Sequence, residues 1–108
     1  MSSESPVCAL ICNGKHCRGQ ARERLCAALA EQGVRVEATH CLQICHGPVV
    51  LAQIGDHWEA VSRVRGKRAR ANLLRAMQRQ RRRPVRERLV RGSKRERALA
   101  RGHAKRFA

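Results

Sequence analysis

The sequence predicts a small α/β sandwich followed by a basic C-terminal tail. Short apolar runs alternate with a helical pattern of apolar residues, which is typical of a strand–helix–strand unit. A Gly-Asp turn between two later apolar runs predicts a β-hairpin. The last part of the chain is dense in arginine and poor in apolar residues, which indicates a tail with a composition of its own.

The first half of the predicted fold is the strand–helix–strand unit. Residues 6–12 form a short apolar run, which predicts a buried strand. Residues 20–32 carry apolar side chains at helical spacing, and Gly33 suits the C-terminal cap of that helix. Residues 34–38 alternate with period two, as a half-exposed strand does. Such a unit pairs its two strands in parallel through a right-handed crossover.

The second half adds a hairpin and a helix. Residues 49–54 and 58–64 are the expected hairpin strands, and residues 65–83 are a basic helix that a following proline ends. This order predicts a thioredoxin-like sandwich over residues 6–83. Residues 84–108 are an Arg-rich C-terminal extension, for which packing against the domain and disorder are both open alternatives.

The charge of the chain is strongly uneven. Residues 1–62 hold five basic and six acidic residues, whereas the remainder holds nineteen basic and two acidic residues. This asymmetry favours an acidic partner: a redox protein with an acidic face, nucleic acid bound through the Arg-rich half, or an anionic membrane surface. A solvated basic tail is the simpler alternative. Phe107 is the one aromatic residue after the hairpin, so base stacking there would be poor.

The sequence also bounds the compartment. No apolar stretch is long enough to span a membrane, and no signal-peptide pattern is visible. We therefore expect a cytoplasmic protein whose thiols stay reduced, and cysteines in such proteins more often bind metals or take part in redox chemistry than form structural disulfides. The oligomeric state is open, and a homodimer is one alternative.

Four of the six cysteines lie where loops leave predicted strands: Cys12, Cys17, Cys41 and Cys45. Because the carboxyl ends of parallel strands meet at one edge of a sheet, the two pairs are expected to converge. Converging thiolates bind zinc or an iron–sulfur cluster. The C-x4-C and C-x3-C spacings are wider than the C-x2-C knuckles of structural zinc, which favours the larger [2Fe-2S] cluster.

The remaining thiols and the neighbouring histidines have simpler interpretations. Cys8 in the first strand and Cys26 on the first helix are expected to be core residues. His16, His40 and His46 each lie beside a predicted ligand, where the alternatives are a hydrogen bond to the cluster's sulfurs, solvent exposure, or replacement of one cysteine. The chain has no C-x2-C pair, so a thioredoxin-type dithiol mechanism lacks its usual attacking pair. We expect an electron-transfer protein rather than an enzyme.

These segments resemble the thioredoxin-like [2Fe-2S] ferredoxin family. Residues 7–18, VCALICNGKHCR, resemble its first ligand pair, and residues 41–50, CLQICHGPVV, resemble its second. The likeness extends over roughly residues 6–80. The resemblance implies that Cys12, Cys17, Cys41 and Cys45 bind one [2Fe-2S] cluster. It also implies an electron carrier, of the kind that serves as the cluster-bearing small subunit beside the flavin subunit of respiratory NADH:quinone oxidoreductase.

The sequence therefore predicts a carrier that transfers single electrons to a protein partner. Two alternatives from other classes stay open. One is a zinc-stapled basic module that binds nucleic acid. The other is a redox sensor in which the loss of the cluster changes what the basic half binds.

Overall fold

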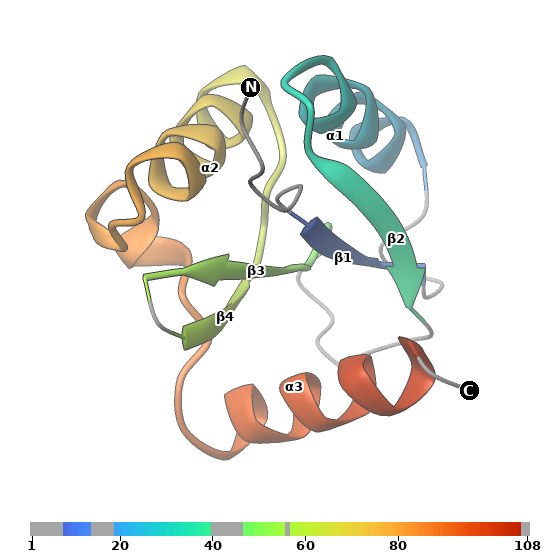
Figure 1. Cartoon of the computed structure of the whole chain (residues 1–108), viewed down its shortest axis with the longest axis vertical. Coiled ribbons are helices and arrows are strands. Elements are labelled where there is room, and N and C mark those ends of the chain that lie inside the picture. The colour runs from blue at the N-terminus through green and yellow to red at the C-terminus, as the bar shows by residue number, and fades with distance from the viewer. Residues whose placement is uncertain (1–7, 14–18, 40–46, 56, 107–108) are drawn as a thin grey trace, which may run out of the picture.

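The computed structural model describes residues 8–13, 19–39, 47–55 and 57–106, with side chains up to residue 102. Its centre is a four-stranded mixed sheet in the order β2-β1-β3-β4 (Figure 1). The strands are β1 (Cys8–Cys12), β2 (Arg35–Thr39), β3 (Val50–Ile54) and β4 (His57–Val61). β1 pairs in parallel with β2 and antiparallel with β3, and β3 and β4 form the hairpin. The predicted α/β class, parallel pair and hairpin are confirmed.

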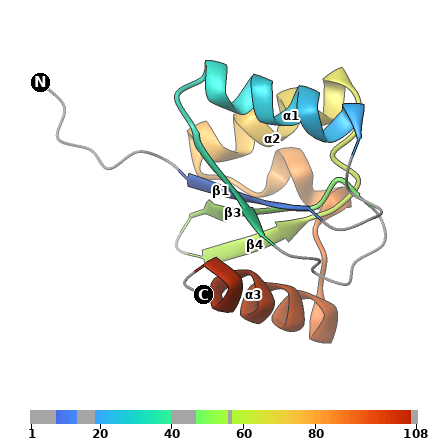
Figure 2. The same ribbon diagram turned by 90° about the vertical axis from the view of Figure 1, so that its right-hand side faces the viewer.

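Helices cover both faces of this sheet and make a three-layer domain (Figure 2). One face carries α1 (Gln20–Glu31) and α2 (Lys67–Arg79), and the other carries α3 (Gly92–Arg106). A short 3₁₀ helix, η1 (Arg83–Arg88), joins α2 to the strand edge. No described helix is long and apolar enough to cross a membrane.

The central strand β1 has apolar side chains on both faces because it is covered on both. Successive side chains of a strand point to opposite faces. Ala9 and Ile11 accordingly join the core under α1 and α2, whereas Leu10 and Cys12 join the core under α3. A strand buried on both faces reads as a continuous apolar run rather than as an alternating one, as the sequence of β1 does.

The basic helix is shorter than the predicted span of residues 65–83. α2 begins after Gly66 and ends where Gln80 takes a left-handed conformation, with φ of 56°. The Gln80 side chain secures this end, since its amide nitrogen donates to the carbonyl oxygen of Met77 at 2.6 Å and its oxygen accepts from the backbone N–H of Gly55 at 2.9 Å. Pro84 therefore does not end the helix and lies in η1.

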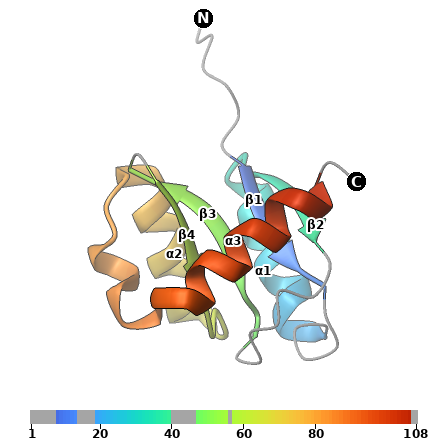
Figure 3. The same cartoon turned by 90° about the horizontal axis from the view of Figure 1, so that it is seen from below.

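The Arg-rich extension packs against the sheet. The backbone N–H of Ser62 donates to Arg88 at 2.8 Å, that of Val90 donates to Ala60 at 2.8 Å, and Leu89 pairs with Val61 in an antiparallel bridge. This short pairing covers the outer edge of β4, which would otherwise expose unpaired backbone groups. From there α3 crosses the sheet from β4 towards β2 (Figure 3). Of the two alternatives that the sequence left open, the structure has the packed one.

A buried carboxylate fastens this third layer. Glu59 on β4 is 4% exposed, and its oxygens accept hydrogen bonds from Arg82 at 3.3 Å and Arg95 at 3.1 Å. Arg95 also donates to the backbone oxygen of Trp58 at 2.9 Å and to Glu96 at 2.8 Å. The hydrogen bond to Glu59 raises the pKa of Arg95; burial opposes this rise, and attraction to the Glu59 and Glu96 carboxylates adds to it. A buried charge is tolerated only when it is paired in this way.

Replacing the buried member of this network should cost far more stability than replacing the exposed one. We expect Glu59→Ala to lower the free energy of unfolding by about 2 kcal/mol, because it leaves the guanidinium groups of Arg82 and Arg95 without their buried partner. Glu96 is 73% exposed, so Glu96→Ala should change the free energy of unfolding by less than about 0.5 kcal/mol. Urea unfolding at constant m-value measures both. Equal losses would contradict the role given to Glu59.

Candidate metal centre

The carboxyl ends of β1 and β2 meet at one edge of the sheet, as the strand–helix–strand pattern predicts. Cys12 is opposite Thr39 in the strand register, and the backbone N–H of Asn13 donates to the Thr39 oxygen at 3.0 Å. The backbone N–H of Cys12 donates to the oxygen of Val49, also at 3.0 Å. Thr39, which precedes the second cysteine pair in the chain, and Val49, which follows it, therefore both lie beside Cys12.

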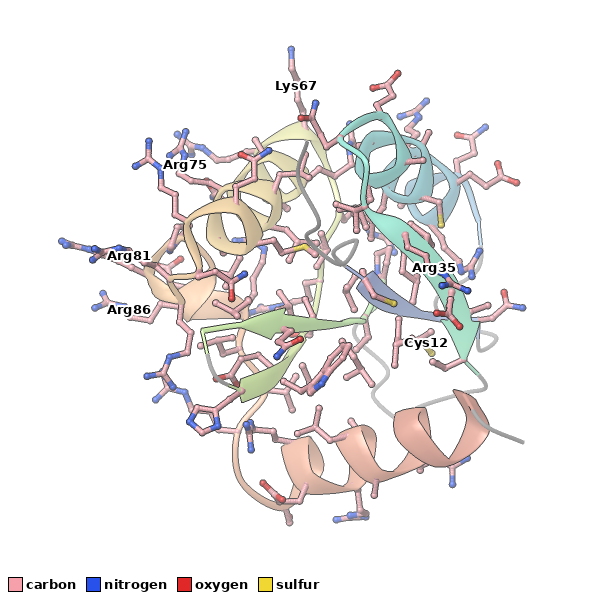
Figure 4. All side chains as sticks on the ribbon, viewed as in Figure 1. Cys12, Arg35, Lys67, Arg75, Arg81 and Arg86 are labelled. Atoms are coloured by element: carbon pink, nitrogen blue, oxygen red, sulfur yellow. The ribbon has the colours of Figure 1, made fainter. Side chains whose placement is uncertain are left out.

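Of the four predicted ligands, Cys12 lies among the described residues, and Cys17, Cys41 and Cys45 lie outside them. Cys12 is 1% exposed and sits in the apolar cluster beneath α3 (Figure 4). Within the described ranges no group of three or more metal-ligating side chains occurs. The structure thus places one predicted ligand together with the chain segments that border the others.

Cys8 and Cys26 lie elsewhere in the domain. Cys8 is on the same face of β1 as Cys12 but four residues away, which corresponds to about 13 Å along a strand. Its Sγ donates to a carboxylate oxygen of Glu37 at 3.4 Å. Cys26 is on α1 and packs against the core of the opposite face. Both thiols are half-buried against the core, as the sequence predicts.

Arginine side chains and helix starts surround this edge with positive charge. From the first turn of α1, Arg22 donates its Nε–H to the backbone oxygen of Cys12 at 3.1 Å. Arg65 donates to the backbone oxygen of Gly47 at 3.3 Å. The starts of α1 and α2 face each other across a cleft of about 620 Å³ that Arg24, Arg65, Lys67 and Arg70 line. Helix N-termini carry partial positive charge, so their direction and these side chains favour anionic groups nearby.

Several of these features escaped the sequence analysis. Arg22 and the Cys12 carbonyl are 10 positions apart in the chain, and Arg65 and the Gly47 carbonyl are 18 apart. No local sequence pattern predicts either contact. The apolar cluster that holds Cys12 also includes Ala98, with Leu99 packed against it, and both belong to a short apolar run within an arginine-rich stretch. The pair Ala98-Leu99 was the available signal for a packed helix there.

Comparison of the chain with models of protein families, with curated proteins and with solved structures gave no match.

The burial of Cys12 should be visible as slow chemical modification. In protein treated with a chelator, we expect iodoacetamide to alkylate Cys12 about tenfold or more slowly than the half-buried Cys26, because reagent reaches Cys12 only when α3 opens locally. Mass spectrometry of the peptides measures both rates. Glu59→Ala, which loosens α3, should accelerate the modification of Cys12 and leave that of Cys26 unchanged. Equal rates in the unaltered protein would contradict the placement of Cys12 beneath α3.

Proposed function

We propose that this protein is an electron carrier that binds one [2Fe-2S] cluster through Cys12, Cys17, Cys41 and Cys45. The observation that carries the proposal is the meeting of Cys12, Thr39 and Val49 at one sheet edge through backbone hydrogen bonds. It supports convergence of the two cysteine pairs. The strand order β2-β1-β3-β4, with a parallel first pair and an antiparallel hairpin, supports the thioredoxin-like form of the sandwich.

The chemistry at this edge suits such a cluster. Thiolates are the ligands that iron–sulfur clusters take, and an all-cysteine site would let the bound cluster accept and release single electrons at a potential a few hundred millivolts negative. Cys12 is 1% exposed and belongs to the same apolar cluster as Ala98, so its surroundings hold little water. Arg22, Arg65 and the two helix starts stabilise thiolate and net negative charge beside them.

The charge of the protein suits a redox partner with an acidic face. The chain carries a formal net charge of +16, and complementary charge raises the rate at which two proteins meet. A reducing compartment such as the cytoplasm would keep the cysteines available as ligands.

Two cysteines on the same face of β1 provide a matched test. Cys12→Ser should lower cluster content or cluster lifetime about tenfold or more, because it removes a ligand. Cys8→Ser should leave the cluster content near that of the unaltered protein. Iron and acid-labile sulfide after anaerobic purification, together with EPR spectra of the reduced protein, measure the outcome, and urea midpoints verify that both variants fold.

Two results would overturn the proposal. One is a colourless protein with stoichiometric zinc after anaerobic reconstitution, which would favour the zinc-stapled module. The other is an identical loss of cluster in Cys8→Ser and Cys12→Ser.

One observation favours a second candidate, the cluster-dependent redox sensor. Through Ala98, α3 packs in the same apolar cluster as Cys12, and through Arg95 it joins the Glu59 network at the other end of the sheet. A sensor of this kind predicts faster amide hydrogen exchange in residues 95–102 once the cluster is removed. Unchanged exchange there would exclude it.

A further inference from the structure

A second cleft, of about 1180 Å³, lies between the β3–β4 turn, η1 and the start of α3. The β3–β4 turn follows Ile54, which lies beyond the first residues of β1 in the register, so this cleft is at the sheet edge opposite Cys12. Figure 4 shows Arg81 and Arg86 pointing outward on the side of the molecule away from Cys12. Six arginines line the cleft: Arg81, Arg82, Arg83, Arg86, Arg91 and Arg95.

Among the described residues, most of this charge has no counter-charge. Arg82 and Arg95 neutralise Glu59, the single carboxylate among the described lining residues. In the described ranges, which leave out Asp56, no carboxylate oxygen lies within 4.0 Å of the other four guanidinium groups. Those four side chains are exposed. Gathering unpaired like charges around one hollow costs free energy through repulsion, and a bound anion removes that cost.

The backbone that carries these arginines is held in place. Val85, at the centre of η1, is 1% exposed and belongs to the core under α2. The residues after η1 pair with β4, and Gln80 fixes the end of α2 to the hairpin. A ligand therefore meets arginines on a rigid frame, which lowers the cost of ordering the site on binding.

We propose that this cleft binds the sugar–phosphate backbone of nucleic acid without reading its bases. Guanidinium groups form paired hydrogen bonds with phosphate oxygens. The positive surface continues from the cleft onto α2, where Arg75 points outward on the same side as Arg81 and Arg86 (Figure 4). An extended line of positive charge matches a polymer with a phosphate on every residue better than it matches a single small anion.

The make-up of the cleft also determines what kind of recognition occurs. No Phe, Tyr or Trp side chain is among the described lining residues, and His57 is the single ring there, so the stacking that single-strand binding proteins use is weak at this cleft. Binding should therefore depend on salt and be indifferent to sequence. An acidic protein surface presents a lower density of negative charge than a nucleic-acid backbone, and the experiment below separates these two partners.

The test uses the full chain and a pair of double variants that remove equal charge. Arg81→Ala with Arg86→Ala removes two exposed arginines of the cleft. Arg24→Ala with Arg35→Ala removes two from the other side of the molecule, one of which lines the cleft beside the candidate metal centre. The probe is a short mixed-sequence RNA strand carrying a fluorophore, titrated at several salt concentrations, with polyglutamate of similar length as the competing acidic polymer.

The cleft variant should bind RNA about tenfold more weakly, and the slope of log affinity against log salt should fall by about 1.4, which is about 0.7 for each lost contact to a single strand. The control variant should lose about twofold or less. Two RNA strands of unrelated sequence should bind alike. Urea midpoints should match in all three proteins, because Arg81 and Arg86 have no described side-chain partner and the ion pair of Arg35 with Glu37 is largely exposed.

Three results would overturn the proposal. The first is an equal loss of RNA affinity in the two double variants, and the second is an RNA affinity unchanged by the cleft substitutions. The third is polyglutamate that binds as tightly as RNA, which would assign the cleft to an acidic protein. The measurement does not require a cluster on the cysteines, so its failure would leave the electron-carrier proposal untouched.

Discussion

The buried carboxylate of Glu59 is the constraint on which the third layer of this domain depends. It lies on an edge strand and accepts hydrogen bonds from Arg82, which precedes η1, and from Arg95 of α3. In a segment with nineteen basic and two acidic residues, repulsion among the basic side chains opposes compact packing of that segment. A desolvated carboxylate with two guanidinium partners offsets that repulsion at the place where the chain passes from one face to the other.

The two proposed sites follow from how the third layer is attached. The middle of α3 packs through Ala98 into the apolar cluster that holds Cys12, and its first turn lines the arginine-rich cleft. The two sites lie at opposite edges of the same sheet because β1 runs from the hairpin-turn side to the Cys12 side. Both edges are basic, but one holds Cys12 beside two helix starts, and the other gathers guanidinium groups around a neutralised carboxylate.

Much of the fold was predictable because its signals are local. Patterns within a few residues predict three of its features. They are the apolar run of β1, the helical spacing of Leu25 and Leu29 in α1, and the turn at Gly55 between β3 and β4. The end of α2 was not predictable, because it depends on Gln80 bonding to the hairpin 25 residues earlier rather than on Pro84. The packing of residues 84–106 against the sheet could not be predicted either. This stretch has few apolar residues, and its contacts join residues far apart in the chain.

The sequence by itself determined that the cysteine-bearing segments leave one edge of the sheet. A right-handed strand–helix–strand unit places the ends of its parallel strands together whatever surrounds them. Its cysteine spacing and its resemblance to a ferredoxin family carry the assignment of Cys17, Cys41 and Cys45, which stays a prediction. Only the tertiary structure decided that Cys12 lies beneath α3, and that Glu59 gathers arginines from two faces. Cys12 and Ala98 come together from opposite ends of the chain, and the Glu59 contacts join residues 23 and 36 positions apart. Such contacts are selected by burial and charge pairing in the folded domain.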